Sequence, residues 1–259
     1  MTFFVSHSRI TFSDERQNGT NAFRGALGAR LHNSESLYRQ WFDPCWHEGP
    51  SGYRSAPRPF VLRQTCDSCA GLDLVVFRKD VEQRELEETL RQAVASVPGA
   101  SDIAVRSATQ LELPLEAPKK EGTLRIEFVT PTALKRAGTI ANEPEFTTVI
   151  GRLAERIRAL GRLYQNWPAH VVFDEMLTWA ACVKLVNHEW NRHKGERRRS
   201  ARSDAVHDLR GFTGWAEYEG PVGHFLALLE IGGWTGVGRH TVWGNGMIRV
   251  ARFTERSAA

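Results

Sequence analysis

The chain has 259 residues, of which 41% are hydrophobic and 25% are charged. These proportions are typical of a globular protein and exclude a disordered, collagen-like or coiled-coil chain. No apolar run reaches the length of a membrane span, the first residues lack the pattern of a secretory signal, and four cysteines are too few for a disulfide scaffold in a chain of this length. We therefore expect a cytoplasmic protein of one or two domains that has no membrane partner.

The first 116 residues alternate strand-like and helix-like patterns. Period-two or continuous apolar runs predict strands, and apolar residues at helical spacing predict helices. The expected strands are 2–12, 59–64, 72–78 and 102–116, and the expected helices are 22–42 and 80–97. The order strand, helix, strand, strand, helix, strand is the ferredoxin-like order.

A short polar stretch at 117–122 separates this half from a second one. The second half carries expected strands at 123–132, 211–220 and 247–253, and expected helices at 146–164, about 170–190, and 222–233. We expect it to be a related unit with an enlarged helical region between about 135 and 207. The sequence thus predicts an α+β fold with two tandem ferredoxin-like domains, 1–116 and 123–259, and a helical, Arg-rich insertion in the second.

The positive charge of the chain is concentrated in one segment. The net charge is +4, and residues 188–202 alone hold six Arg or Lys against two Glu. A basic cluster with Trp190 inside a balanced chain indicates a nucleic-acid partner, although such runs are also typical of a solvated helix end. We expect a helix or helix tip here, with candidate RNA-binding residues Arg192, Lys194, Arg197, Arg198, Arg199 and Arg202.

Residues 232–246 are rich in glycine, and Arg239 and His240 lie in the middle of this loop. Glycines at this density allow positive φ angles and close approach of a ligand, and they expose N–H groups to anions. A dinucleotide-binding fingerprint is excluded because a helix precedes the loop and a strand follows it, and the phosphate-binding GxxxxGK[ST] pattern is absent. An anion-binding loop and a purely structural hairpin both remain open.

The segment GVGRHTVWGNG at 236–246 resembles the C-terminal glycine-rich motif of the RAMP superfamily, with Asn245 at a position that is usually apolar. Three further stretches, FRGALGARL (23–31), PRPFVLR (57–63) and RIEFVTPT (125–132), resemble segments of the CRISPR precursor-RNA processing endoribonucleases of that superfamily, in the same order. The resemblance implies two ferredoxin-like units in tandem. The basic segment and the short chain suggest a divergent branch that serves a type IV or a type III CRISPR system.

The resemblance also implies the chemistry: metal-independent cleavage of repeat RNA by attack of a 2′-OH, which gives a 2′,3′-cyclic phosphate and a 5′-OH, without a cofactor. The family often places a catalytic His after its first strand, but residues 13–21 contain none. Arg24, His32 and Arg39 fall on one stripe of the expected helix 22–42 and are our catalytic candidates. Two guanidiniums would stabilise the charge of the phosphorane, whereas Glu35 paired with Arg39 would instead make a solvated face.

The RNA-binding candidates in the loop are Gly236, Gly238, Arg239, His240, Gly244 and Gly246. The expected partners are the CRISPR repeat RNA and other subunits of a CRISPR ribonucleoprotein complex. A non-catalytic RNA-binding subunit of such a complex is the alternative function. Cys45, His47, Cys66 and Cys69 could form a Cys₃His zinc site, but reduced cysteines in a loop explain them equally and no metal is expected.

Overall fold

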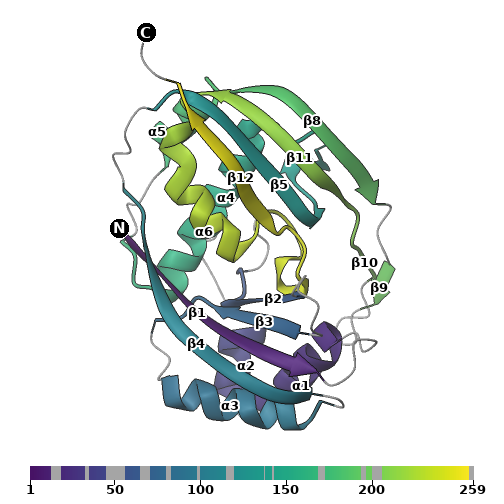
Figure 1. Cartoon of the computed structure of the whole chain (residues 1–259). Helices are drawn as coiled ribbons and strands as arrows, with labels where there is room; N and C mark the ends of the chain where they lie inside the picture. Colours follow the sequence, from purple (N-terminus) through teal and green to yellow (C-terminus); the bar gives the residue numbers. More distant parts are fainter. Residues whose placement is uncertain are drawn as a thin grey trace.

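The computed structural model of the chain contains two four-stranded antiparallel sheets with helices between and beside them (Figure 1). It describes residues 1–12, 19–32, 35–44, 56–64, 71–79, 83–97, 100–114, 120–136, 138–141, 143–168, 173–193, 197–199 and 206–256.

The first sheet belongs to an N-terminal unit with the expected ferredoxin-like order. Its elements are β1 (Thr2–Phe12), α1 (Gly19–His32), α2 (Glu35–Phe42), β2 (Phe60–Gln64), β3 (Gly71–Val76), α3 (Gln83–Ala95) and β4 (Ala100–Glu112). The strand order β2-β3-β1-β4 places the first strand at the centre, beside the third and fourth. The helix expected over 22–42 is two helices, because α1 ends at His32 and α2 begins at Glu35. The intervening Asn33 and Ser34 are residue types that favour helix ends over helix interiors.

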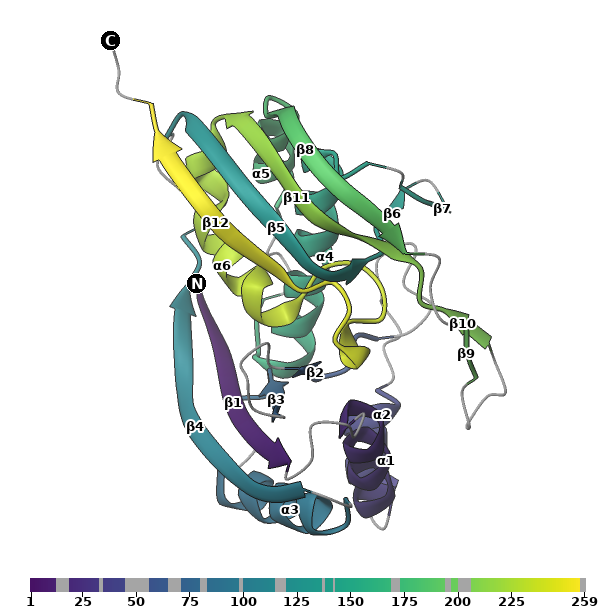
Figure 2. The same ribbon diagram turned by 45° about the vertical axis from the view of Figure 1, so that its right-hand side comes forward.

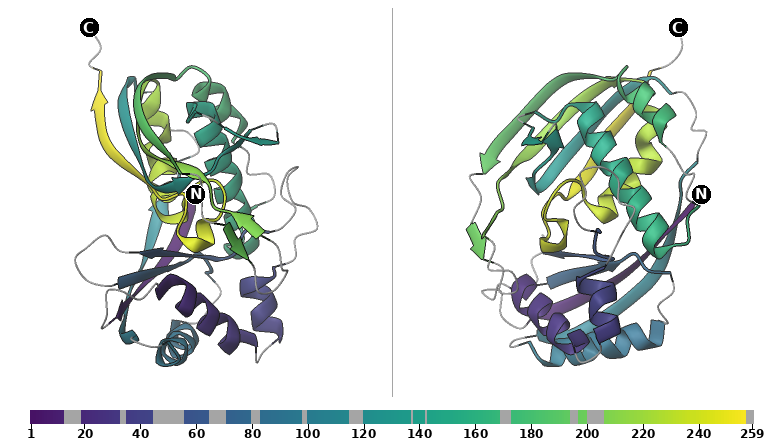
Figure 3. Two further views of the ribbon diagram at one scale, coloured as in Figure 1. Left: turned by 90° about the vertical axis from the view of Figure 1, so that its right-hand side faces the viewer. Right: turned by 180° about the vertical axis from the view of Figure 1, so that it is seen from behind.

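The second sheet belongs to a C-terminal unit of the same topology. Its elements are β5 (Gly122–Thr132), α4 (Phe146–Tyr164), α5 (Asp174–Ala180), β8 (Lys184–His193), β11 (Gly211–Gly220), α6 (Leu226–Thr235) and β12 (Ile248–Glu255). The strand order β12-β5-β11-β8 again puts the first strand between the third and fourth. Seen from behind in Figure 3, α4 and α6 cover one face of this sheet. The prediction of two tandem ferredoxin-like units is confirmed.

The helix expected over about 170–190 is wrong in its second half. α5 ends at Ala180, and residues 184–193 form strand β8, which pairs with β11 along almost its whole length. β8 is an edge strand with mostly exposed residues, so it lacks the period-two pattern that predicts a strand. The backbone ladder with β11, which local helical spacing does not reveal, determines its conformation.

The region expected to be a helical insertion, 135–207, is therefore only partly helical. Besides α4 and α5 it contains the two-residue strands β6 (Lys135–Arg136) and β7 (Thr139–Ile140), strand β8, and the short strands β9 (Arg197–Arg199) and β10 (Val206–Asp208). β9 pairs with β10 and extends the β8–β11 hairpin away from the sheet (Figure 2). The Arg-rich segment is thus the outer part of a β-ribbon.

The first sheet is buried on both faces. Ile10, Leu72 and Leu74 pack with α1, α2 and α3 in one hydrophobic core, while Phe3, Val75 and Phe77 share a second core with α4, α6 and the second sheet. Strand residues alternate between faces, so each strand contributes side chains to two cores.

The division of the chain at 117–122 remains a prediction. In the described residues, no helix is long and apolar enough to cross a membrane.

Candidate catalytic site and nucleic-acid interface

Arg24 lies on α1 with its side chain between two aromatic rings. Its guanidinium carbon is 5.6 Å from the centre of the Phe42 ring, at the end of α2, and 5.4 Å from the centre of the Trp243 ring. Trp243 belongs to a single helical turn, η2 (Thr241–Trp243), inside the glycine-rich loop. Arg24 therefore lies where α1, α2 and the loop of the C-terminal unit meet.

The ring contacts continue on both sides of Arg24. The His240 ring stacks on Trp243 at 5.1 Å, the Tyr38 ring stacks on Phe42 at 5.4 Å, and His32 meets Tyr38 edge-on at 4.9 Å. A row of side chains thus links His32 to His240 through Arg24, and it includes three of the residues that the sequence singled out. The aromatic members were not predicted as site residues.

The single catalytic stripe expected from the sequence is wrong, because the helix that would carry it is interrupted. Arg24 and His32 share α1, whereas Arg39 belongs to α2. His32 and Arg39 are exposed and Arg24 is partly buried. The role of all three in catalysis remains a prediction.

The four glycines of the loop motif all adopt positive φ angles. The angles are +70° at Gly236, +81° at Gly238, +86° at Gly244 and +75° at Gly246. A Cβ at Gly244 would lie 2.8 Å from the carbonyl oxygen of Leu62, and one at Gly238 or Gly246 would clash with a backbone carbonyl. The loop backbone therefore requires glycine at these positions.

The N–H groups of the loop are largely used within the protein. The amides of Gly236, Gly244 and Gly246 donate to the carbonyls of Gly232, Thr241 and Pro131, at 2.9, 3.0 and 3.1 Å. The amide of Arg239 donates to Ala133 at 3.1 Å. These N–H groups are not available to a phosphate, which favours the structural interpretation of the glycines. The side chain of Arg239 is exposed, and its contact with RNA remains a prediction.

The loop connects the two units. Val242 is buried in the core of the N-terminal unit, and η2 packs against β2. His240 adopts a left-handed conformation with a φ of +63°, which costs a non-glycine residue about 1 kcal/mol or more. The loop thus places His240 and Trp243, which belong to the C-terminal unit, next to Arg24 of the N-terminal unit.

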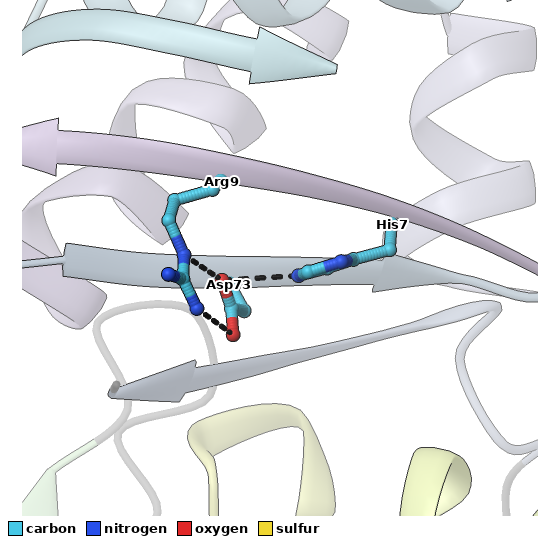
Figure 4. Close-up of polar contacts among 3 residues, drawn as sticks. All are labelled: His7, Arg9 and Asp73. Carbon is cyan, nitrogen blue, oxygen red and sulfur yellow. Dashed lines mark hydrogen bonds and ion pairs between the residues drawn. The ribbon is translucent and has the colours of Figure 1, made fainter. Parts of the chain in front are cut away.

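A second polar cluster lies on the face of the first sheet that is turned toward the C-terminal unit (Figure 4). Asp73 of β3 accepts from the Nε of Arg9 at 2.9 Å, and the His7 Nε2 is 3.0 Å from the same carboxylate oxygen. Burial would raise the pKa of Asp73, but the hydrogen bonds and charges of His7 and Arg9 outweigh it and lower the pKa to about 2. This cluster was not predicted from the sequence, although His7 and Arg9 at alternate positions of the expected strand 2–12 were a visible signal.

Two arginines hold the C-terminal end of α6. Arg63 of β2 donates to the carbonyl of Trp234, and Arg156 of α4 donates to the carbonyl of Thr235 at 3.0 Å. Burial lowers the pKa of Arg63 to about 10, although Asp73 opposes the shift. Cations at the C-terminus of a helix are favourable because the last carbonyls lack helical partners. The arrangement fixes the point at which the glycine-rich loop leaves α6.

The remaining candidates of the sequence analysis lie apart from this site or outside the described residues. Arg192 is exposed on β8, and Arg197, Arg198 and Arg199 form strand β9. Lys194, Arg202 and the zinc candidates Cys45, His47, Cys66 and Cys69 lie outside the described residues. Among the residues that the structure describes, no group of three or more His, Cys, Asp or Glu could hold a metal ion.

The second ferredoxin-like unit carries the glycine-rich loop between its last helix, α6, and its last strand, β12. Residues 126–248 match the family described as CRISPR-associated endoribonuclease Cas6. This match covers 123 of the 259 residues, slightly less than half of the chain. A sequence search of the curated proteins finds no match.

Solved structures show the same fold over nearly the whole chain. A product complex of Cas6 (TTHB231) has 18% sequence identity and a TM-score of 0.62, and covers 96% of this chain and 100% of the other. A second structure of Cas6 (TTHB231), from Thermus thermophilus, has 17% sequence identity and a TM-score of 0.60, and covers 96% of this chain and 99% of the other. A substrate mimic complex of Cas6 (TTHA0078) has 17% sequence identity and a TM-score of 0.58, and covers 96% of this chain and 99% of the other. At these identities the likeness establishes the fold.

Proposed function

We propose that this protein is a metal-independent endoribonuclease that cleaves CRISPR repeat RNA and keeps its product bound. The position of Arg24 carries the proposal: a partly buried guanidinium at the junction of α1, α2 and the glycine-rich loop, in a Cas6-type fold. Structures of similar fold, which include a substrate mimic complex and product complexes of Cas6, support the substrate class. Assignment to a type IV CRISPR system remains a prediction from the sequence.

The proposed reaction is attack of the 2′-OH on the adjacent phosphate, with a 2′,3′-cyclic phosphate and a 5′-OH as products. Negative charge develops on the phosphorane, and a preformed cation beside it stabilises the transition state. Arg24 would supply this charge, with Arg39 as a second contact from α2. Arginine is too basic for an ordinary general base, so His32, exposed at the end of α1, is the candidate for proton transfer.

The basic ribbon would hold the repeat by its phosphates. β9 carries three consecutive arginines, and the exposed Arg192 precedes them on β8. Because phosphate contacts provide affinity without sequence readout, this arm would anchor the RNA while the Arg24 site cleaves it. Other subunits of a CRISPR ribonucleoprotein are the proposed further partners.

The test is a cleavage assay with repeat RNA in the presence of EDTA. The unaltered protein should cut the RNA, whereas Arg24→Ala should slow cleavage by about 100-fold and still bind. Arg39→Ala tests the second contact in the same way. Tight binding without any cleavage would favour the alternative function, a non-catalytic RNA-binding subunit. This alternative stays open because Arg39 lies on α2, so it does not share one helix stripe with Arg24 as expected for the catalytic pair.

A further inference from the structure

Trp243 and Phe42 contact the Arg24 guanidinium from two different elements, one in each unit of the protein. An aromatic ring attracts a cation over its face, and the attraction is strongest for Trp and grows when water is excluded. The flat guanidinium stacks on a ring through its face but binds a phosphate through its edge. A guanidinium restrained by the faces of two rings can therefore still bind a phosphate through its edge.

The loop backbone is built to bring the indole to this place. The motif glycines take positive φ angles, the amides of Gly236, Gly244 and Gly246 donate to α6, to the loop itself and to β5, and Val242 is buried in the N-terminal core. Both sequence neighbours of Trp243 are thus fixed in place: Val242 is buried, and Gly244 approaches β2 closely. His240, in its left-handed conformation, stacks on the same indole.

Resting on the proposed function, we infer that Trp243 is a positioning residue for cleavage, which with Phe42 holds the Arg24 guanidinium in the orientation that meets the scissile phosphate. In this chain the glycine-rich loop acts on the RNA through that indole rather than through its backbone N–H groups. A small misalignment of a charge-stabilising group is enough to slow an enzyme considerably.

The test is a double-mutant cycle in single-turnover cleavage. Trp243→Leu keeps an apolar side chain but removes the aromatic face, and should slow cleavage about 10-fold with little change in RNA affinity. Trp243→Phe should restore most of the rate. In an Arg24→Ala background, Trp243→Leu should cause no further slowing, because the group it orients is gone. A purely structural role would instead slow both backgrounds equally, which would overturn the inference.

A matched control is available on the second sheet. Trp215 lies 3.7 Å from the guanidinium carbon of Arg125, away from the loop, so Trp215→Leu removes the same kind of contact and should leave the rate unchanged. Arg24→Lys provides a second measurement should Trp243→Leu not fold. Lysine keeps the charge but lacks a planar face, so it should be about as slow as Trp243→Leu, and a normal rate would contradict the inference.

The two proposals fail in different ways. If the unaltered protein binds repeat RNA and never cleaves it, the proposed function is wrong. If it cleaves and Arg24→Ala is slow while Trp243→Leu is as fast as the unaltered protein, only the positioning role is wrong.

Discussion

The side-chain amide of Gln165 hydrogen-bonds to the backbone of Phe4 at both ends. Its Oε1 accepts from the Phe4 N–H at 2.9 Å, and its Nε2 donates to the Phe4 carbonyl at 2.9 Å and to the Phe77 carbonyl at 2.9 Å. Gln165 follows α4, whereas Phe4 and Phe77 belong to the N-terminal unit. One buried side chain thus takes the place of a neighbouring strand for the start of β1.

Gln165→Ala should destabilise the whole chain. It leaves buried backbone groups without partners, and each costs about 1–3 kcal/mol, so we expect a loss of about 3 kcal/mol in the free energy of unfolding. Chemical denaturation measures this. Gln92, whose hydrogen bond to Glu88 is exposed, is the matched control, and Gln92→Ala should change little. Equal stability of the two variants would contradict the proposal that the hydrogen bonds of Gln165 stabilise the contact between the units.

Two glycines should respond to alanine in opposite directions. A Cβ at Gly246, at a φ of +75°, would clash with the carbonyl of Val237, whereas a Cβ at Gly25 on α1 meets no atom within 4 Å. Gly246→Ala should therefore cost about 2 kcal/mol or more, and Gly25→Ala should stabilise the protein by about 0.5–1 kcal/mol. Thermal unfolding of both variants checks this, and a neutral Gly246→Ala would mean that the loop does not need glycine there.

Asp73 should make the stability of the chain depend on pH in the acid range. Its pKa falls from 3.8 to about 2 on folding, so its ionised form stabilises the folded state above pH 4, and this contribution is lost as the pH falls toward 2. Because the carboxylate is only partly buried, we expect about 1–2 kcal/mol.

Asp73→Asn should thus be less stable than the unaltered protein at pH 7, and the difference should shrink between pH 4 and pH 2. Denaturant unfolding across this range measures it. A difference that is the same at every pH would show that the charge of Asp73 is not what His7 and Arg9 stabilise.

Replacing Arg197, Arg198 and Arg199 with Ala should weaken RNA binding mainly at low salt. If each arginine contacts a phosphate, the slope of log K against log salt should fall by about 2–3 units. The matched control removes three arginines from β12 and its end, Arg249, Arg252 and Arg256, of which Arg249 and Arg256 are paired with carboxylates. An unchanged slope in the first triple variant would show that the ribbon is only solvated.

The sequence predicted the architecture well where patterns are local and strong. The strand at 2–12 and the helix at 146–164 have the bounds of β1 and α4, because both bury a regular apolar face. β8 was missed because an exposed edge strand carries no such pattern, and its conformation comes from pairing with β11. The break between α1 and α2 was missed because Asn33 and Ser34 are the only residues in the sequence that indicate a helix end there.

The candidate site was predicted only in part. Arg24, His32 and His240 were found from their residue types, and the structure links them in one row of contacts. Trp243, Phe42 and Tyr38 read as ordinary core residues in the sequence. Their role depends on packing between residues about 200 positions apart, such as Arg24 and Trp243, and no periodicity within one segment reveals such a contact.

The most direct test of the central claim uses a repeat RNA with a single 2′-deoxy nucleotide at the cleavage position, in the presence of EDTA. The deoxy substrate lacks only the nucleophile, so it should bind with normal affinity and remain intact, while the unmodified RNA is cut and ends in a 2′,3′-cyclic phosphate. Cleavage of the deoxy substrate at the same position, or activity only after Mg²⁺ is added, would contradict the account.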